Sequence, residues 1–151
     1  MTTRIRPTTA ADHAAVRGLA GELLAGMAPE RPAAGLAAAA ASWVDDACRG
    51  SADSVLLVAC DGAAVLGFAG VGERTHFSGE REASLGELVV APSARRRGVG
   101  VLLAHAAEEW ARQRGLGRVT QETGTANGPA RELYARLGYV EEQVTLTRAL
   151  R

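Results

Sequence analysis

The sequence has 151 residues, a length typical of one domain, and no linker rich in proline, glycine or serine divides it, so we expect a single domain over residues 1–151. Its 17 acidic and 17 basic residues cancel, which excludes a global field that would attract nucleic acid or an anionic membrane. Every basic residue is arginine, so the chain lacks the lysine that a Walker loop or a Schiff-base enzyme requires.

The N-terminus and the cysteines indicate a cytoplasmic protein. Residues 1–7 lack the apolar core of a signal peptide, and no apolar run reaches the roughly 18 residues of a membrane span. Cys48 and Cys60 match neither a disulfide framework nor a metal-binding pair, so we expect two buried thiols.

The first half of the chain predicts a strand, two helices and a hairpin. Thr9 can cap the first helix, with Asp12 three residues later, and apolar residues then recur at helical spacing up to Leu23. Asp61-Gly62 is a turn signal between two apolar runs. The expected elements are an edge strand at 3–6, helices from Thr9 and over about 33–48, and strands at 54–60 and 65–71.

The second half predicts a strand, helix, strand and helix, followed by two closing strands. The polar segment 72–81 is interpreted as a long connection. The elements expected after it are strand 83–90, helix 98–114, strand 119–123, a short helix 129–137, and strands 139–142 and 144–148. One helix joins strands 83–90 and 119–123, so these strands should run parallel in a mixed sheet between helical layers.

The segment after strand 83–90 has the chemistry of an anion-binding loop. Three consecutive arginines lead to Gly98 and Gly100, and an amphipathic run follows without a gap. Free N–H groups and the dipole of the helix N-terminus favour a phosphate there. A dinucleotide fingerprint does not fit, because its third glycine would fall at Leu103. Taken alone, the loop could also be a solvated turn.

Two blocks of sequence carry a resemblance to a known family. The first is Glu-Leu-Val-Val at 87–90 with Arg-Arg-Arg-Gly-Val-Gly at 95–100, and the second is Asn-Gly-Pro-Ala-Arg-Glu-Leu-Tyr-Ala-Arg-Leu-Gly-Tyr at 127–139. In order and spacing they resemble the GNAT superfamily of acyl-CoA-dependent N-acetyltransferases. The resemblance implies a three-layer α/β/α sandwich, whose mixed, mostly antiparallel central sheet is splayed between two parallel strands. It also implies acetyl-CoA as the acyl donor.

The resemblance assigns the cofactor site. Pantetheine would enter the gap between strands 83–90 and 119–123 and pair with the backbone of the first, and the diphosphate would lie on the arginine loop. The implied cofactor-binding residues are Leu88, Val89, Val90, Arg95, Arg96, Arg97, Gly98, Val99, Gly100 and Asn127, the last as a hydrogen-bond partner of the pantetheine arm.

The resemblance also implies direct attack by a primary amine on the thioester. A strand N–H would stabilise the oxyanion, and Tyr134 would protonate the departing thiolate. The general base stays open between Glu87 and Glu122, each of which could instead bind the amine, and His76 is a third candidate.

The acceptor is expected to be a small-molecule amine. In this family the region between the first two helices helps to form the acceptor site, so Met27 and Trp43 are candidate contacts, with core packing as the alternative. A protein N-terminus or lysine, or a catalytically silent CoA-binding regulatory domain, are alternative functions. We expect no nucleic-acid or membrane partner. We also expect no metal, since His105 has no second histidine at ligand spacing. Exposed closing strands and family habit favour a homodimer.

Overall fold

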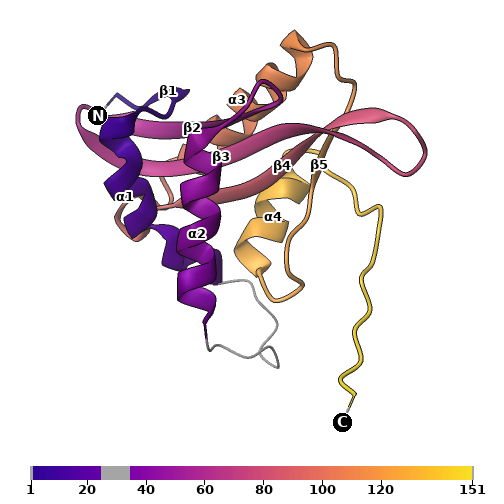
Figure 1. Cartoon of the computed structure of the whole chain (residues 1–151). Helices are drawn as coiled ribbons and strands as arrows, with labels where there is room; N and C mark the ends of the chain where they lie inside the picture. Colours follow the sequence, from indigo (N-terminus) through magenta and orange to yellow (C-terminus); the bar gives the residue numbers. More distant parts are fainter. Residues whose placement is uncertain (1, 25–34, 151) are drawn as a thin grey trace.

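The structure, a computed structural model, describes residues 2–24 and 35–150 (Figure 1). Met27, a candidate substrate contact, lies outside these residues. The elements in chain order are β1 (Arg4–Pro7), η1 (Ala10–Asp12), α1 (His13–Gly18), η2 (Ala20–Leu24), α2 (Leu36–Arg49), β2 (Ser54–Asp61), β3 (Ala64–Thr75), β4 (Arg81–Val90), η3 (Pro92–Ala94), α3 (Val99–Gln113), β5 (Val119–Gln121) and α4 (Gly128–Arg136).

The strands form one mixed sheet in the order β1-β2-β3-β4-β5. Neighbouring strands are antiparallel except for the last pair, β4 and β5, which are parallel because α3 carries the chain back between them. β1 and β5 lie at the two edges. The predicted edge strand at 3–6 and the predicted parallel pair are therefore confirmed.

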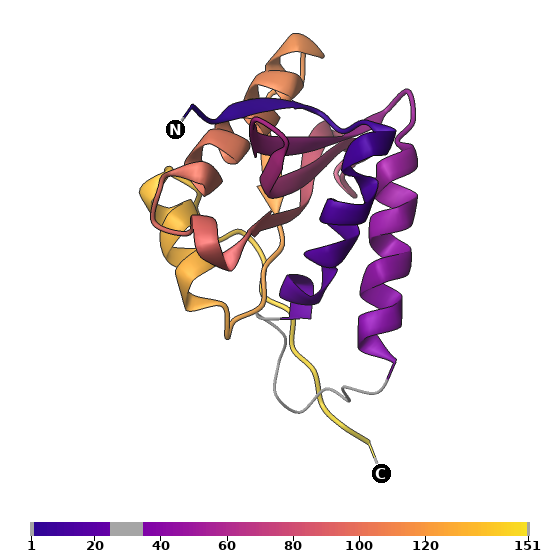
Figure 2. The same ribbon diagram turned by 90° about the vertical axis from the view of Figure 1, so that its left-hand side faces the viewer.

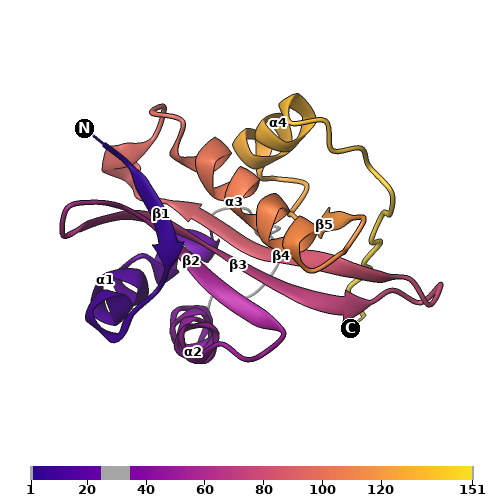
Figure 3. The ribbon, with the colours of Figure 1, turned by 90° about the horizontal axis from the view of Figure 1, so that it is seen from above.

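Helices cover both faces of the sheet, as the predicted three-layer sandwich requires. Figures 2 and 3 show α1 and α2 on one face and α3 and α4 on the other. A buried cluster lies on each face, one around Val44 and Phe68 and the other around Leu85 and Leu103. The inner face of α3 is rich in alanine, which lets its backbone approach the sheet closely. No helix in the described part of the chain is long and apolar enough to cross a lipid bilayer.

The predicted long connection at 72–81 is wrong. β3 continues to Thr75 and β4 begins at Arg81, so only residues 76–80 connect the two strands. Arg74 and Glu82 lie directly opposite each other and form an ion pair at 3.0 Å. Charged cross-strand pairs stabilise this part of the hairpin, although its polar composition resembles that of a loop.

The two predicted closing strands, 139–142 and 144–148, are also wrong. Residues 140–150 are extended and exposed, and they run away from the sheet (Figure 1). The apolar residues whose alternation predicted a strand are 76–90% exposed, namely Val140, Val144, Leu146 and Leu150. A strand needs an edge to pair with, and β5 at this end of the sheet has only three residues.

Candidate active site

β4 and β5 diverge soon after they begin to pair. Residues 83–85 lie opposite residues 119–121, and β4 then continues to Val90. Gly86 is an extra residue at this point, because the pairing of β4 with β3 skips it. Such a bulge bends a strand and increases its twist. Residues 86–90 therefore have β3 on one side and, within the described chain, no strand on the other.

The open side of β4 presents the backbone groups of alternate residues. The N–H of Ala91 donates to the carbonyl oxygen of Leu66 in β3 at 2.8 Å. Consecutive residues of a strand point their N–H and C=O groups to opposite edges, so Val89 also faces β3, whereas Leu88 and Val90 face the gap. The gap is bordered by main-chain donors and acceptors that have no strand partner in the described chain.

The arginine loop follows this strand and leads directly into α3. Arg96 has a φ of +64°, and Gly98 has a φ of +76° at the N-cap of the helix. Positive φ is uncommon outside glycine, and such backbone strain concentrates at ligand-binding positions. The first N–H groups of α3 have no helical acceptor, and the helix dipole makes this end positive. The loop therefore favours an anion.

Gly98 and Gly100 are required for different reasons. A Cβ on Gly98 would meet nothing within 4 Å, so this position needs glycine for its backbone conformation. A Cβ on Gly100 would lie 3.2 Å from Leu133 and 3.7 Å from the side chains of Leu88 and Val90. Glycine at this position lets the first turn of α3 pack closely against β4 and α4.

The three arginines of the loop display their charge to solvent. All three residues are exposed, and Arg95 donates to a carboxylate oxygen of Glu22 in η2 at 2.6 Å. This ion pair ties the loop to the helical layer on the opposite face of the sheet. The local positive charge expected from the sequence therefore lies beside the open end of β4.

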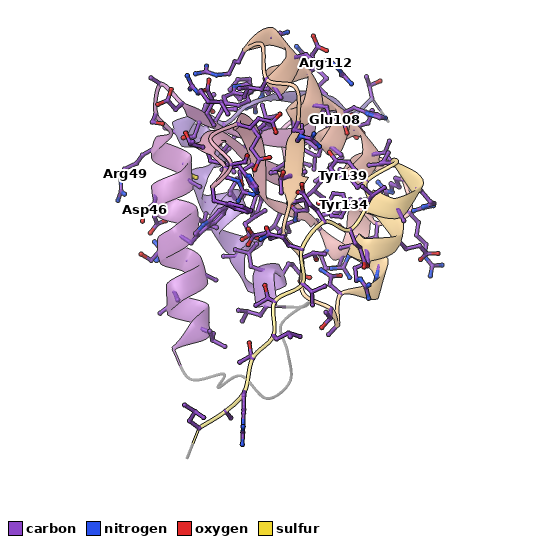
Figure 4. The ribbon with its side chains drawn as sticks, turned by 90° about the vertical axis from the view of Figure 1, so that its right-hand side faces the viewer. Asp46, Arg49, Glu108, Arg112, Tyr134 and Tyr139 are labelled. Atoms are coloured by element: carbon purple, nitrogen blue, oxygen red, sulfur yellow. The ribbon has the colours of Figure 1, made fainter. Side chains whose placement is uncertain are left out.

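Tyr134 projects from α4 and is buried, with 6% of its surface exposed. Its ring contacts the edge of the Tyr139 ring, with the centroids 5.2 Å apart (Figure 4). Burial raises the pKa of the Tyr134 phenol above its ordinary value, and the nearby Glu87 carboxylate raises it further. The phenol therefore stays protonated at neutral pH, as a proton donor must.

The Glu87 side chain lies on the opposite face of the sheet from Tyr134. Its neighbour Val89 belongs to the cluster under α1 and α2, so alternation places the Glu87 side chain on that face too, whereas Tyr134 lies with α3 and α4. Burial raises the pKa of the Glu87 carboxyl. The charge of the Glu87 carboxylate is also the second cause that raises the pKa of the Tyr134 phenol.

Glu122 lies in a different environment. Its side chain is 83% exposed and accepts a hydrogen bond from Arg74 at 3.2 Å. Arg74 also binds Glu82, which is 1% exposed and accepts a further bond from Thr120 at 2.8 Å. Glu122 is thus the exposed end of a network that joins β3, β4 and the end of β5.

Trp43 extends from α2 over the bulge in β4. A Cβ on Gly70 would lie 3.4 Å from the indole, and one on Gly86 would lie 3.7 Å from it. The two glycines therefore leave the space that the indole occupies. Trp43 is only partly buried, although it packs against the cluster around Val44. The sequence alternatives of core packing and substrate contact are both compatible with this position.

The other polar candidates have clear local partners. The side-chain oxygen of Asn127 caps α4 by accepting a bond from the N–H of Ala130 at 3.3 Å. His76 lies in the loop between β3 and β4 and bonds to Ser78 at 2.8 Å. His105 is exposed on α3 and bonds to a carboxylate oxygen of Glu108 at 3.0 Å.

Sequence reasoning missed one contact of the site, the bond from the Tyr139 hydroxyl to Glu108 at 2.9 Å. The side chain of Glu108 is only 16% exposed, and the hydroxyl of Tyr139 bonds to it. The available signal was the five-residue separation of the only two tyrosines in the chain.

Comparison with known proteins decides the family. The sequence profile of the acetyltransferase (GNAT) family matches residues 22–139, which is more than half of the chain. The chain belongs to the GNAT family of acetyltransferases. The resemblance inferred from its two motif blocks is therefore confirmed.

Curated relatives support this assignment within the GNAT family. Over 91 residues the chain is 41% identical to an aminoglycoside N(6')-acetyltransferase type 1 of Klebsiella aerogenes, covering 58% of this chain and 59% of the relative. It is 35% identical over 91 residues to the uncharacterized N-acetyltransferase YhfO of Bacillus subtilis, covering 60% and 61%. The chain thus matches about three fifths of the length of these relatives.

Solved structures share the GNAT fold. An aminoglycoside acetyltransferase, AAC(6')-Iy, in complex with the bisubstrate analogue CoA-S-monomethyl-acetylneamine has a TM-score of 0.76 at 22% identity over the whole of both chains. The aminoglycoside 6'-N-acetyltransferase AAC(6')-IG of Acinetobacter haemolyticus has a TM-score of 0.75 at 17% identity, covering 98% of each chain. At these identities the likeness establishes the fold alone.

Proposed function

We propose that this chain is a single-domain N-acetyltransferase that transfers the acetyl group of acetyl-CoA to a primary amine on a small molecule. One observation supports this most directly. The open edge of β4 leads without interruption into a positively charged loop at the N-terminus of α3. An extended ligand with amide groups at one end and phosphates at the other matches both parts of this site.

The residues present fit such a ligand. The free backbone groups of Leu88 and Val90 would pair with the pantetheine amides, and the loop from Arg95 to Gly100 would hold the diphosphate. Charge-assisted hydrogen bonds contribute about 1.5 to 3 kcal/mol each, so a few of them suffice to hold the anionic end. The backbone groups of Val89 face β3, so this residue would contribute to the cofactor site only through its buried side chain. Asn127 would cap α4, and its amide group would hydrogen-bond to the pantetheine arm.

The thioester supplies an activated acyl carbon, and the protein supplies the proton transfers. Glu87 would accept a proton from the ammonium form of the substrate, after which the nitrogen attacks the acyl carbon. A free N–H of the β4 edge would donate to the acyl oxygen. As the new C–N bond forms and the C–S bond breaks, Tyr134 would give its proton to the leaving sulfur, and the phenolate would then take up the proton that the nitrogen loses as it becomes an amide.

Glu87 is the better-placed base. It is partly buried, it lies on β4 directly before the residues proposed to bind the thioester arm, and burial raises its pKa. Glu122 is exposed and ion-paired with Arg74, which favours a role in attracting a cationic substrate.

Aminoglycosides are the first acceptors to test, because the relative that shares 41% identity over 91 residues is an aminoglycoside acetyltransferase. Acetylation of protein amines and a silent CoA-binding role remain the alternatives. A release assay for free thiol, run with neamine, spermidine, amino acids and short peptides, separates the three. Thiol release with the peptides alone would assign a protein substrate. If none of the amines caused thiol release, the result would support the silent CoA-binding domain.

Thermal melts with acetyl-CoA test the cofactor. At a hundred-fold excess over Kd, binding should raise Tm by roughly 5–10 °C. The variant Tyr134→Phe should keep this shift and lose most of the thiol release. An unchanged release rate would remove Tyr134 from the chemistry. A missing shift would reject the cofactor.

We also propose that the active form is a homodimer. Each chain exposes a sheet edge at β5 and an extended segment at 140–150 whose apolar residues alternate. Burying four aliphatic side chains stabilises an assembly by about 1.5–3 kcal/mol each, so a second copy is a favourable partner for this segment. Light scattering should give twice the chain mass, and the variant Val144→Asp/Leu146→Asp should be monomeric. A monomeric wild-type protein would refute the proposal.

The cytoplasm is the proposed location. Cys48 and Cys60 are both free thiols, as expected for a reducing compartment, and acetyl-CoA is made inside cells.

A further inference from the structure

Tyr134 is not held in place by its own hydroxyl group. Among the described residues, no hydrogen bond involves the Tyr134 hydroxyl, which leaves it available for a ligand. The ring is instead fixed by packing, and its contact with Tyr139 is edge-on at 64°. The N–H of Tyr139 also donates to the carbonyl oxygen of Tyr134 at 2.9 Å, which closes the end of α4.

Tyr139 is in turn tied to α3. Its hydroxyl donates to one carboxylate oxygen of Glu108 at 2.9 Å, and the ring of His105 bonds to the other oxygen at 3.0 Å. Figure 4 shows Glu108, Tyr139 and Tyr134 one after another beside α4. With only 16% of its side chain exposed, Glu108 has little freedom to move.

The helix that holds Glu108 is also the helix that follows the arginine loop. Glu108 lies ten residues after Gly98, or about 15 Å along the helix axis. One rigid element therefore carries the loop proposed for the diphosphate and the anchor of Tyr139. Any ligand held at the N-terminus of α3 has a fixed distance to Tyr134 as long as the bond between Tyr139 and Glu108 is intact.

We propose that Tyr139 and Glu108 are positioning residues that hold the phenol of Tyr134 at the gap between β4 and β5. The inference rests on the proposed role of Tyr134 as general acid. A misplacement of about 1 Å costs as much as a hundred-fold in rate, so a bond that fixes this ring has a measurable effect on turnover.

The kinetic test uses Tyr139→Phe, which keeps the ring and removes its bond to Glu108, and Glu108→Ala, which removes the acceptor. Each should lower kcat by roughly ten-fold with KM for acetyl-CoA unchanged, since neither residue lies on the proposed cofactor site. Glu108→Gln keeps an acceptor oxygen and should restore most of kcat. The control Glu109→Ala removes a neighbouring exposed carboxylate and should have no effect.

A double-mutant cycle separates positioning from general damage to the fold. In the Tyr134→Phe background, Tyr139→Phe should cause no further loss of kcat, because it acts through the phenol that is already gone. Equal losses in both backgrounds, or a loss confined to Tm or to KM, would overturn the proposal.

A readout without turnover keeps this result distinct from failure of the proposed function. The chain has only two tyrosines, so labelling tyrosine with ¹³C gives two sets of ring signals that the two phenylalanine variants assign. Glu108→Ala should shift the Tyr134 ring signals and Glu109→Ala should not. If Tyr134→Phe keeps full turnover, the acid assignment fails, whereas unshifted Tyr134 signals in Glu108→Ala would overturn the positioning role itself.

Discussion

Gly67 in β3 offers a sharp test of how tightly the strand beside the gap is packed. A Cβ at this position would lie 2.4 Å from the carbonyl oxygen of Val89 and 3.2 Å from the Cα of Val90. Real Cβ atoms essentially never approach closer than 3.0 Å, so Gly67→Ala must push these atoms apart by at least 0.6 Å, the difference between 3.0 and 2.4 Å. Both are backbone atoms held in the β3–β4 ladder, so no side chain can rotate away to relieve the contact.

Overpacking of this kind costs about 3 kcal/mol, which for a chain of this size lowers Tm by roughly 6–12 °C. Acetyl-CoA should also bind more weakly, since Val90 borders the proposed pantetheine site. Calorimetry with and without acetyl-CoA measures both effects. The matched control is Gly18→Ala at the end of α1, where a Cβ meets nothing within 4 Å and a small gain in stability is expected. A fall in Tm of less than about 2 °C for Gly67→Ala would refute the packing argument.

Three further variants probe the site and its frame. Glu87→Gln should abolish most thiol release yet raise Tm at pH 7, because burial raises the pKa of this carboxyl and its charged form therefore disfavours the fold. The gain in Tm should shrink as the pH falls and vanish well below about pH 4, where the carboxyl is protonated in both the folded and the unfolded chain, and an equal gain at both pH values would contradict this reasoning. Asp12→Asn should lower the free energy of unfolding by about 1 kcal/mol at pH 7, since the bonds from Arg6 and Thr9 hold the pKa of Asp12 low. This loss of stability should shrink as the pH falls below about 4, and chemical denaturation at several pH values measures it. Gly100→Ala should weaken acetyl-CoA binding in a thermal-shift titration and lower Tm modestly, and unchanged binding would mean that α3 moves away from Leu133 without disturbing the loop.

The elements that bury a regular apolar face could be predicted from the sequence. α2 and α3 follow the helical spacing of their apolar residues, and their bounds differ from the expected ones by at most a few residues. Failures occurred where pairing decides the structure. Arg74 is polar enough to suggest a loop, but it lies in a strand because Glu82 is opposite. Residues 140–150 alternate like a strand, but among residues 2–24 and 35–150 no long free strand edge pairs with them.

The candidate site was predictable where it depends on local sequence. The loop from Arg95 to Gly100 has its expected place between β4 and α3, because glycine conformation and helix initiation are local properties. The environments of Glu87 and Glu122 were not predictable, since burial of one and ion pairing of the other depend on contacts between distant elements. The same holds for Trp43, whose position over Gly86 follows from the bulge in β4.

Because β4 pairs with β5 over only three residues, the far half of β4 has a free edge, and the proposed cosubstrate would pair with this edge as an additional strand would. In the free protein the amide hydrogens of Leu88 and Val90 should exchange rapidly with deuterium, whereas that of Ala91, bonded to Leu66, should be protected. Bound acetyl-CoA should slow exchange at the first two positions alone. The pattern of protected amides would then show, residue by residue, where the ligand pairs with β4.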